Sequence, residues 1–308
     1  MTLSDHARTD EPIPGNPFDL KDVASYTRWR ERRLQYRAAR PADLLVPVAN
    51  PAHLSRSELE AITACCRHNN LALYETRATV GKEDLLALGH QLGLQRIDGN
   101  LCADKDNISA LQVSDQGRKP GYIPYTNKPL SWHTDGYYNT PDRQIRAFVL
   151  HCVAPAVSGG ESCLMDHELA YILLRDENPA WIEALMAPDA MTIPPNVENG
   201  VEIRGAETGP VFSFHEASQS LHMRYSARTR NIAWKADTAT AEAVEFLRLL
   251  WEQESPYIYR HKLRAGQGVI SNNVLHCRTG FADDSGSGPT RLLYRARYYD
   301  RVQNTGLL

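Results

Sequence analysis

The stretch SWHTDGYYNTP, residues 131–141, places a histidine and an aspartate two positions apart between aromatic neighbours. In a β-strand, residues i and i+2 point to the same face of the sheet, so His133 and Asp135 could bind one metal ion together. The ordinary alternative is a turn with a solvated histidine. A chain with 11 histidines is expected to contain roughly one H-x-D pattern by chance. This pattern alone does not distinguish a metal site from a turn.

A metal site of this kind requires at least one more ligand. Fe(II) oxygenases commonly use two histidines and one carboxylate on one face of the metal, which leaves positions open for cosubstrate and O₂. The second histidine is expected on a distant strand, and His276, at the end of the apolar run GVISNNVLHC, is the candidate. His151 competes with it, but the nearly continuous apolar run FVLHCV is more typical of a core histidine with a single hydrogen bond.

Three arginines follow His276 in the predicted strand PTRLLYRARYYD. Their even spacing places Arg291, Arg295 and Arg297 on one face. One interpretation is a strand with one side in water, because three buried arginines would need acids opposite them. The other is that one or two of them bind a dicarboxylate or an anionic substrate, for which the guanidinium fork is suited.

The first hundred residues are predicted to be mixed α and β. Residues 1–17 are polar and rich in proline and acid, which is typical of a mobile tail. The segments that follow are a strand at 43–50, a helix at 55–70, a strand at 71–77 and a helix at 81–94 that ends near Gly93.

From residue 108 the pattern changes to short β runs separated by turn residues. Helices are expected only at 166–177, 179–186 and 238–254. About ten strands with few helices indicate a closed or sandwich-like β architecture such as a jelly roll. We therefore expect one domain over 18–308, with a mixed α/β part at 18–100 and a jelly-roll core with a helical insertion at 101–308.

Composition excludes several other classes of protein. With 42% apolar and 23% charged residues and a formal charge of −3, the 308-residue chain is typical of a soluble globular protein without a nucleic-acid surface. The arginine-rich segment 26–40 is interpreted as a solvated helix face, with a basic interaction patch as the alternative. The six cysteines show no C-x-x-C pair, and neither a secretory signal nor a membrane span is evident, so a cytoplasmic location is expected.

Four motifs, taken in order, resemble those of the taurine dioxygenase superfamily of Fe(II)/2-oxoglutarate oxygenases. They are WHTDGYY, LHC…SGGESCLMD, NNVLHCRTGF and RLLYRARYYD, and the resemblance extends from about residue 40 to the end. The nearest similarity is to the γ-butyrobetaine hydroxylase-like branch, through PYTNKPLSWHTDGYYNTP and GGES. The resemblance implies a mainly β fold with flanking helices around a double-stranded β-helix, or jelly-roll, core.

The resemblance also implies roles for individual residues. The iron ligands would be His133, Asp135 and His276. The residues that would bind 2-oxoglutarate are Arg291, at its distal carboxylate, Ser162 of GGES, and Arg295, which some members instead place near the substrate's anionic group. Asn273 and Arg278 fall at supporting positions beside the distal histidine. The chain departs from the pattern with Asn272 in place of an aspartate and with a longer DDSGSGP loop before Arg291.

The implied activity uses Fe(II), 2-oxoglutarate and O₂ to hydroxylate an aliphatic C–H bond, releasing succinate and CO₂. The expected substrate is small and carboxylate-bearing or zwitterionic, resembling an amino acid or a betaine, because aromatic rings favour a cationic head group and arginines favour an anion. Its candidate contacts are Tyr125, Tyr137, Tyr138, Arg295 and Arg297. The alternatives are a non-catalytic jelly-roll metal-binding protein and a Zn(II) metallohydrolase. A homo-oligomer is compatible with the sequence.

Overall fold

The computed structural model describes residues 15–99, 106–113, 122–228, 230, 232–283 and 290–307. Most of the expected N-terminal tail, residues 1–14, lies outside these ranges. Its last residue, Pro17, is buried, and its carbonyl accepts a hydrogen bond from Arg175 at 2.7 Å. The expectation of a mobile segment is therefore wrong for Pro17.

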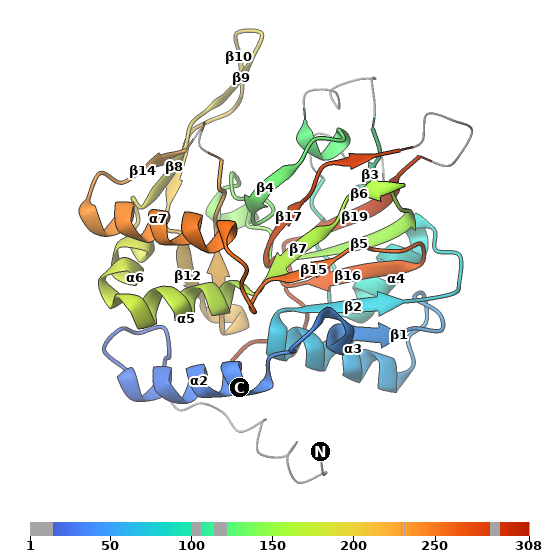
Figure 1. Ribbon diagram of the computed structural model, residues 1–308, viewed down its shortest axis with the longest axis horizontal. Helices are drawn as coiled ribbons and strands as arrows, with labels where there is room; N and C mark the ends of the chain where they lie inside the picture. The colour runs from blue at the N-terminus through green and yellow to red at the C-terminus, as the bar shows by residue number, and fades with distance from the viewer. Residues whose placement is uncertain are drawn as a thin grey trace.

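Two β-sheets face each other at the centre of the molecule (Figure 1). The six-stranded sheet has the order β1 (Leu45–Pro47), β2 (Leu71–Glu75), β16 (Gln267–Ser271), β5 (Ala147–Ala154), β19 (Leu292–Tyr298) and β3 (Ser109–Leu111). The four-stranded sheet has the order β15 (Tyr259–His261), β7 (Ser162–Met165), β17 (Leu275–Arg278) and β4 (Leu130–His133). Only β1 and β2 pair in parallel among the described strands of these two sheets.

Side chains along each strand point alternately to the two faces of the six-stranded sheet, and each face forms part of a separate hydrophobic core. Phe148 and Leu293 of the six-stranded sheet pack against Leu164 and Tyr259 of the four-stranded sheet. The opposite face of the six-stranded sheet packs under α3 (Arg56–Asn69) and α4 (Lys82–Gln91). Residues that point between the sheets are therefore the ones that can reach a central site.

The N-terminal helices end where their sequence signals predict. Ser55 caps α3 and forms a capping box with Glu58. After α4, Gly93 adopts a left-handed backbone with φ of 82°, which glycine tolerates without strain. The predictions of a helix at 55–70, a strand at 71–77 and a helix at 81–94 are confirmed, whereas the strand expected at 43–50 contracts to β1 after a short 3₁₀ turn at Pro41–Leu44.

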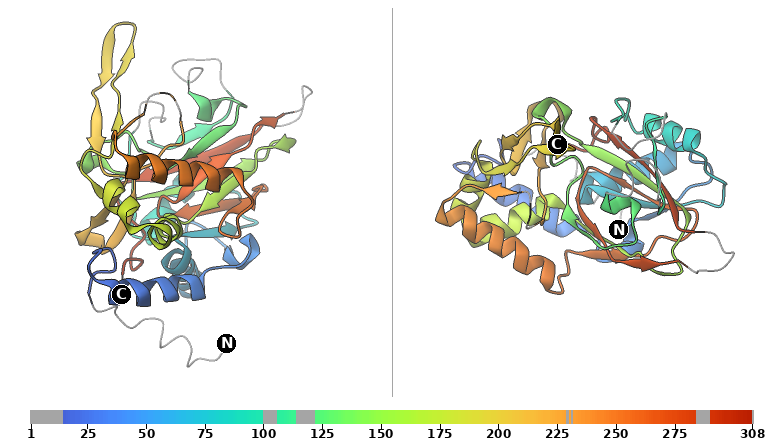
Figure 2. Two further views of the ribbon diagram at one scale, coloured as in Figure 1. Left: turned by 60° about the vertical axis from the view of Figure 1, so that its left-hand side comes forward. Right: turned by 90° about the horizontal axis from the view of Figure 1, so that it is seen from above.

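A second group of elements packs beside the two sheets (Figure 2). Its helices are α2 (Val23–Tyr36), α5 (His167–Glu177), α6 (Pro179–Met186) and α7 (Thr238–Glu252). Its short strands are β8 (Met191–Ile193), β11 (Glu207–Gly209), β12 (Phe212–His215), β13 (Ser220–Met223) and β14 (Ala233–Trp234). The hairpin of β9 (Asn196–Glu198) and β10 (Val201–Arg204) projects away from the body in both figures. The architecture is thus mostly strands with some helices, as expected.

The apolar run GVISNNVLHC does not form one strand. It divides into β16 and β17, which belong to different sheets, and Asn273 between them adopts a φ of 58°. The left-handed residue turns the chain from one sheet to the other, a conformation that asparagine adopts more readily than most residues. His276 consequently lies near the start of β17 rather than at the end of a long strand.

The arginine-rich segment is only partly a solvated face. Arg33 of α2 is buried and forms ion pairs with Asp166 and with Glu168, the latter at 2.9 Å. The expectation of a solvated face is wrong for this residue, because the carboxylates at the start of α5 neutralise it. Among the described residues, no helix combines the length and apolar character that a bilayer crossing requires.

Candidate metal centre

His133 and His276 are direct cross-strand partners on β4 and β17. Their ring centroids are 4.2 Å apart, and His133 Nε2 lies 3.8 Å from Asp135 Oδ1. Ligand atoms of His133, Asp135 and His276 all lie within 4.8 Å of one another. The structure brings the three predicted metal ligands together.

Backbone carbonyls orient both imidazoles. Nδ1 of His133 lies 2.8 Å from the carbonyl oxygen of Ser131, and Nδ1 of His276 lies 2.9 Å from that of Val274. A carbonyl can only accept, so each Nδ1 carries the proton and each Nε2 presents a lone pair. Burial, followed by repulsion from His133, lowers the pKa of His276 to about 3, so its imidazole is neutral at ordinary pH.

Asp135 lies in a sharply turning segment just after β4. The next residue, Gly136, has a φ of 67°, and a Cβ there would lie 2.4 Å from Ile145 Cγ1. Both the backbone conformation and the close contact require glycine. The D-G pair of WHTDGYY therefore has a structural reason: it lets the carboxylate turn back towards the two histidines.

The Asp135 carboxylate is buried but remains charged. Burial is the largest single influence and raises the pKa, but the positive charges of Arg295 and Arg297 hold the pKa well below its usual range. Arg295 Nη1 donates to Asp135 Oδ1 at 3.1 Å, and Arg297 Nη1 lies 3.9 Å from the same oxygen. Two imidazoles and one carboxylate fit a divalent transition metal such as Fe(II).

Arg291 precedes β19 and is buried without a charged partner for its side chain among the described residues. Its guanidinium lies 4.8 Å from the Phe281 ring centroid, and that of Arg278 lies 4.9 Å from the same ring. Burial lowers the pKa of Arg291, and Cys152 and Asp283 oppose this effect. A buried, unpaired guanidinium is what a bound carboxylate would satisfy.

The GGES motif lies beside this arginine. A Cβ at Gly160 would lie 3.6 Å from Arg291 Nε, and one at Gly159 would lie 2.2 Å from the Gly280 carbonyl oxygen. Both glycines also have positive φ, so this turn can pack against β18 (Phe281–Ala282) only with glycine. Ser162 follows at the start of β7, where it pairs with Arg278, two residues along β17 from His276.

Arg295 and Arg297 share the inner face of β19, as their spacing predicts. Arg297 Nη2 donates to Asp98, and its Nη1 donates to the Tyr138 hydroxyl at 3.2 Å. No sequence signal indicates a role for Asp98, an isolated aspartate far from every motif. Its carboxylate neutralises Arg297, which explains how this arginine can be buried.

The candidate substrate tyrosines differ in position. The Tyr137 ring lies 6.4 Å from that of His133 and 5.2 Å from that of Tyr138. Arg204 of the β9–β10 hairpin lies 5.8 Å from the Tyr138 ring centroid. Tyr125, in contrast, is buried in the core between the two sheets.

The supporting asparagines and Arg278 hold the segments around the triad. Arg278 Nη2 donates to the carbonyls of Thr126, at 2.9 Å, and Lys128, at 2.5 Å, just before β4. Asn272 Nδ2 lies 3.2 Å from Asn70 Oδ1 and 3.1 Å from Thr305 Oγ1. An aspartate has no such donor, so the amide at position 272 ties the C-terminal segment to the core.

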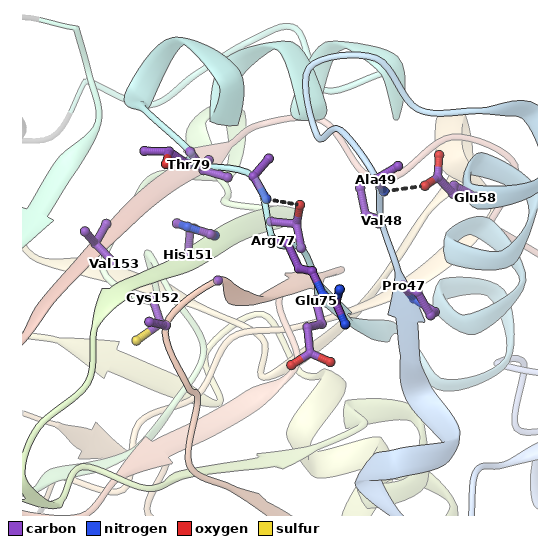
Figure 3. Close-up of a pocket in the computed structure, with 15 residues that line it drawn as sticks. Pro47, Val48, Ala49, Glu58, Glu75, Arg77, Thr79, His151, Cys152 and Val153 are labelled. Carbon is purple, nitrogen blue, oxygen red and sulfur yellow. Dashed lines mark hydrogen bonds between the residues drawn. The ribbon is translucent and has the colours of Figure 1, made fainter.

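A cavity of about 1000 Å³ lies elsewhere, and none of the three metal-ligand candidates lines it (Figure 3). It is bounded by segments 47–49, 75–80, 151–153 and 265–266 together with Glu58. His151 on its wall is buried and makes one hydrogen bond among the described residues, in which Nδ1 and the Tyr74 hydroxyl oxygen are 2.9 Å apart, and this confirms the prediction of a core histidine. The convergent ligands and unpaired arginine place the candidate chemistry at the triad instead.

Two facing sheets with a His–Asp–His cluster between them define the class of non-haem metal oxygenases. Residues 35–297 match the model of the taurine catabolism dioxygenase TauD, TfdA family, so the chain belongs to this family.

Individual proteins show similarity over different lengths. The chain is 29% identical over 191 residues to a uridine-5'-phosphate dioxygenase from Amycolatopsis sp, a region that covers 59% of this chain and 64% of that relative. The fold is similar to that of AAD-2 in complex with Mn(II) and N-oxalylglycine, with a TM-score of 0.61, 14% identity and coverage of 86% of this chain and 98% of that one. It is also similar to asparagine oxygenase in complex with Fe(II), 2S,3S-3-hydroxyasparagine and succinate, with a TM-score of 0.54, 15% identity and coverage of 97% and 92%.

Proposed function

We propose that this protein uses Fe(II), 2-oxoglutarate and O₂ to hydroxylate an aliphatic C–H bond of a small substrate, releasing succinate and CO₂. The observation that carries the proposal is the cluster of ligand atoms of His133, Asp135 and His276 within 4.8 Å, with both Nε2 lone pairs available. Bound iron with 2-oxoglutarate and O₂ would supply the oxidising power. Membership of the family supports the same activity.

The remaining residues would bind and orient. Arg291 would hold the distal carboxylate of 2-oxoglutarate, because its buried guanidinium has no other charged partner among the described residues. Ser162 lies along the same strand pair and would help to bind that cosubstrate. The buried ring of Phe281 contacts the guanidinium groups of both Arg291 and Arg278 and would help to exclude water from this end of the site.

For the core we propose the double-stranded β-helix, or jelly roll. Successive strands alternate between the sheets: β4 and β7 lie in the smaller sheet with β5 between them in the larger, and β17 lies in the smaller with β16 and β19 in the larger. The γ-butyrobetaine hydroxylase-like branch, a cytoplasmic location and a homo-oligomer stay predictions.

The substrate proposed is a small carboxylate-bearing or zwitterionic molecule. Arg295 is the arginine best placed for its anion, because a metal bound to Asp135 would offset the carboxylate charge that Arg295 now faces. Tyr137 and Tyr138 would contact the rest of the molecule, and an ammonium group would gain from their rings. Arg297 would position the Tyr138 hydroxyl, to which it donates a hydrogen bond, because its other terminal nitrogen already pairs with Asp98.

A nucleoside monophosphate is the second candidate substrate. The similarity to a uridine-5'-phosphate dioxygenase favours it, because 29% identity over 191 residues is more specific than shared fold. Its phosphate would also require a cation, and a base could stack on the exposed side of a tyrosine. The two candidates differ in size and charge, so one substrate panel separates them.

The first experiment is anaerobic addition of Fe(II) and then 2-oxoglutarate to the metal-free protein. We expect a weak visible charge-transfer band from the chelate, and its loss in His276→Ala. A Zn(II) metallohydrolase or a non-catalytic metal protein would give no such band. Succinate release is then screened against zwitterions, carboxylates, nucleoside monophosphates and neutral apolar compounds. Succinate release that only the neutral apolar compounds stimulate would contradict both proposed substrate classes.

A further inference from the structure

Two thiols face each other on the outer side of the four-stranded sheet. Cys163 of β7 and Cys277 of β17 are direct antiparallel partners. Their chain neighbours Leu164 and His276 point between the sheets, so both cysteine side chains point the other way. Direct partners in antiparallel strands have Cα atoms about 4.5–5.5 Å apart, within the range that a disulfide spans.

Arg260, Cys163 and Cys277 form a row of side chains across β15, β7 and β17. Arg260 of β15 is the partner of Cys163 on its other side, and Arg260 Nη1 lies 3.3 Å from Cys163 Sγ. A thiolate beside a guanidinium is the form of cysteine that attacks peroxides.

The row is also open to small oxidants. Cys163 is buried, but Cys277 is only partly buried and Arg260 is exposed. Cys152 provides the contrast, because it is buried, donates to the Leu263 carbonyl at 3.7 Å, and has a pKa that burial raises to about 11. Reactivity is therefore expected at one pair of thiols rather than at every cysteine.

We propose that Cys163 and Cys277 form a site of reversible oxidation, at which a hydroperoxide converts the two thiols into one disulfide. The Cys163 thiolate attacks a peroxide oxygen, the O–O bond breaks, and a sulfenic acid forms at Cys163. The Cys277 sulfur then attacks the Cys163 sulfur and displaces water. With hydrogen peroxide the balance is two thiols oxidised by two electrons and one peroxide reduced to two molecules of water.

Oxidation of these two cysteines would affect metal binding at the neighbouring metal centre. Cys277 is adjacent in sequence to His276, and Cys163 is adjacent to Leu164, the cross-strand partner of His276. A disulfide holds its two sulfur atoms in one specific geometry, so it would restrain β7 and β17 beside the ligand. We expect the oxidised protein to bind divalent metal at least about fivefold more weakly, an effect that rests on the proposed metal centre.

The test treats the reduced, metal-free full chain with hydrogen peroxide, alkylates the remaining thiols and maps peptides without reduction. The expected product is a cross-link between the peptides of Cys163 and Cys277 that dithiothreitol reverses. Cys152→Ser should still form it, whereas Cys163→Ser and Cys277→Ser should not. Recovery of Cys163 and Cys277 as separate alkylated or overoxidised residues, with no cross-link, would overturn the proposal.

Arg260→Met keeps both thiols, so this variant tests the proposal even if a serine variant fails to fold. Loss of the cation should slow cross-linking roughly fivefold, while Arg260→Lys should retain most of the rate, because a positive charge stabilises the thiolate. Equal rates in wild type and Arg260→Met would refute the role of Arg260. Cobalt(II) titration of the reduced and oxidised forms tests the coupling: tight binding by both refutes the effect on the metal centre, whereas no binding by the reduced form counts against the proposed function instead.

Discussion

Asn273 hydrogen-bonds to both backbone polar groups of Asp135. Its Oδ1 accepts from the Asp135 N–H at 2.8 Å, and its Nδ2 donates to the Asp135 carbonyl at 2.9 Å and to the Ile145 carbonyl at 2.7 Å. His276 follows three residues later in the chain. One buried amide therefore links the segment that carries the carboxylate ligand to the segment that carries the distal histidine.

Asn273→Asp should weaken metal binding about 10- to 100-fold, because a carboxylate oxygen in place of Nδ2 would face two carbonyl oxygens and release the Asp135 segment. Asparagine and aspartate both tolerate the φ of 58° found here. The measurement is an anaerobic cobalt(II) or iron(II) titration with circular dichroism as a check on folding. Asn304→Asp is the matched control, since Asn304 has the same φ but is exposed. Equal affinity in Asn273→Asp and Asn304→Asp would remove Asn273 from the metal centre.

Arg291→Lys should raise the KM for 2-oxoglutarate at least about tenfold, since a lost charge-assisted bidentate contact costs about 1.5–3 kcal/mol. Arg264→Lys is the control, because Arg264 is exposed and pairs with Glu75 on the surface at 3.0 Å. Succinate release at varied 2-oxoglutarate measures both. A defect in Arg295→Lys without one in Arg291→Lys would show that the assignment across the DDSGSGP loop is wrong.

Much of this architecture follows from local sequence signals. The Ser55–Glu58 capping box, the Asp166 cap of α5 and Pro179 at the start of α6 each mark a helix end that the structure confirms. The triad is predictable for a different reason: motif order and residue type identify the three ligands, and cross-strand pairing of His133 with His276 then brings them together.

The parts that sequence could not predict depend on long-range partners. The turn at Asn273 that divides GVISNNVLHC has only a weak local signal, the pair Asn272-Asn273, because the apolar residues on both sides favour one continuous strand. His167, at the start of α5, and His222, in β13, are both buried, although their own segments contain no signal for it. Arg33 and Arg297 are buried for the same kind of reason: their acids, Asp166 and Asp98, come from distant segments.

Asp98→Ala should lower the free energy of unfolding by about 3–5 kcal/mol, because it leaves the buried guanidinium of Arg297 without its carboxylate. Asp189→Ala, which breaks an exposed pair with Lys235, should cost no more than about 1 kcal/mol. Urea unfolding of the metal-free proteins measures both. A cost below about 1 kcal/mol for Asp98→Ala would mean that water or another acid satisfies Arg297, which would again make it a candidate for binding the substrate anion.

The last prediction concerns the pH dependence of stability at His151. Burial lowers the pKa of His151 to about 4 from an unfolded value of 6.5, so below pH 6.5 the unfolded chain binds more protons than the folded one. Its contribution to stability is therefore complete above pH 6.5, declines as the pH falls towards 4, and changes at most by about 1.4 kcal/mol per pH unit. His222 and His167, whose pKa values burial also lowers, titrate in the same direction, so wild type should lose stability steadily over this range.

His151→Gln should reduce that loss, because glutamine can keep a hydrogen bond to Tyr74 but has no proton to gain. It is expected to be less stable than wild type at pH about 7 yet to fall less between pH about 6.5 and about 4. Urea unfolding at several pH values in this range gives both slopes. His53→Gln, which makes the same substitution at an exposed histidine outside the core, is the control for the change of side chain. Identical slopes for wild type and His151→Gln would mean that the buried imidazole does not couple proton binding to unfolding.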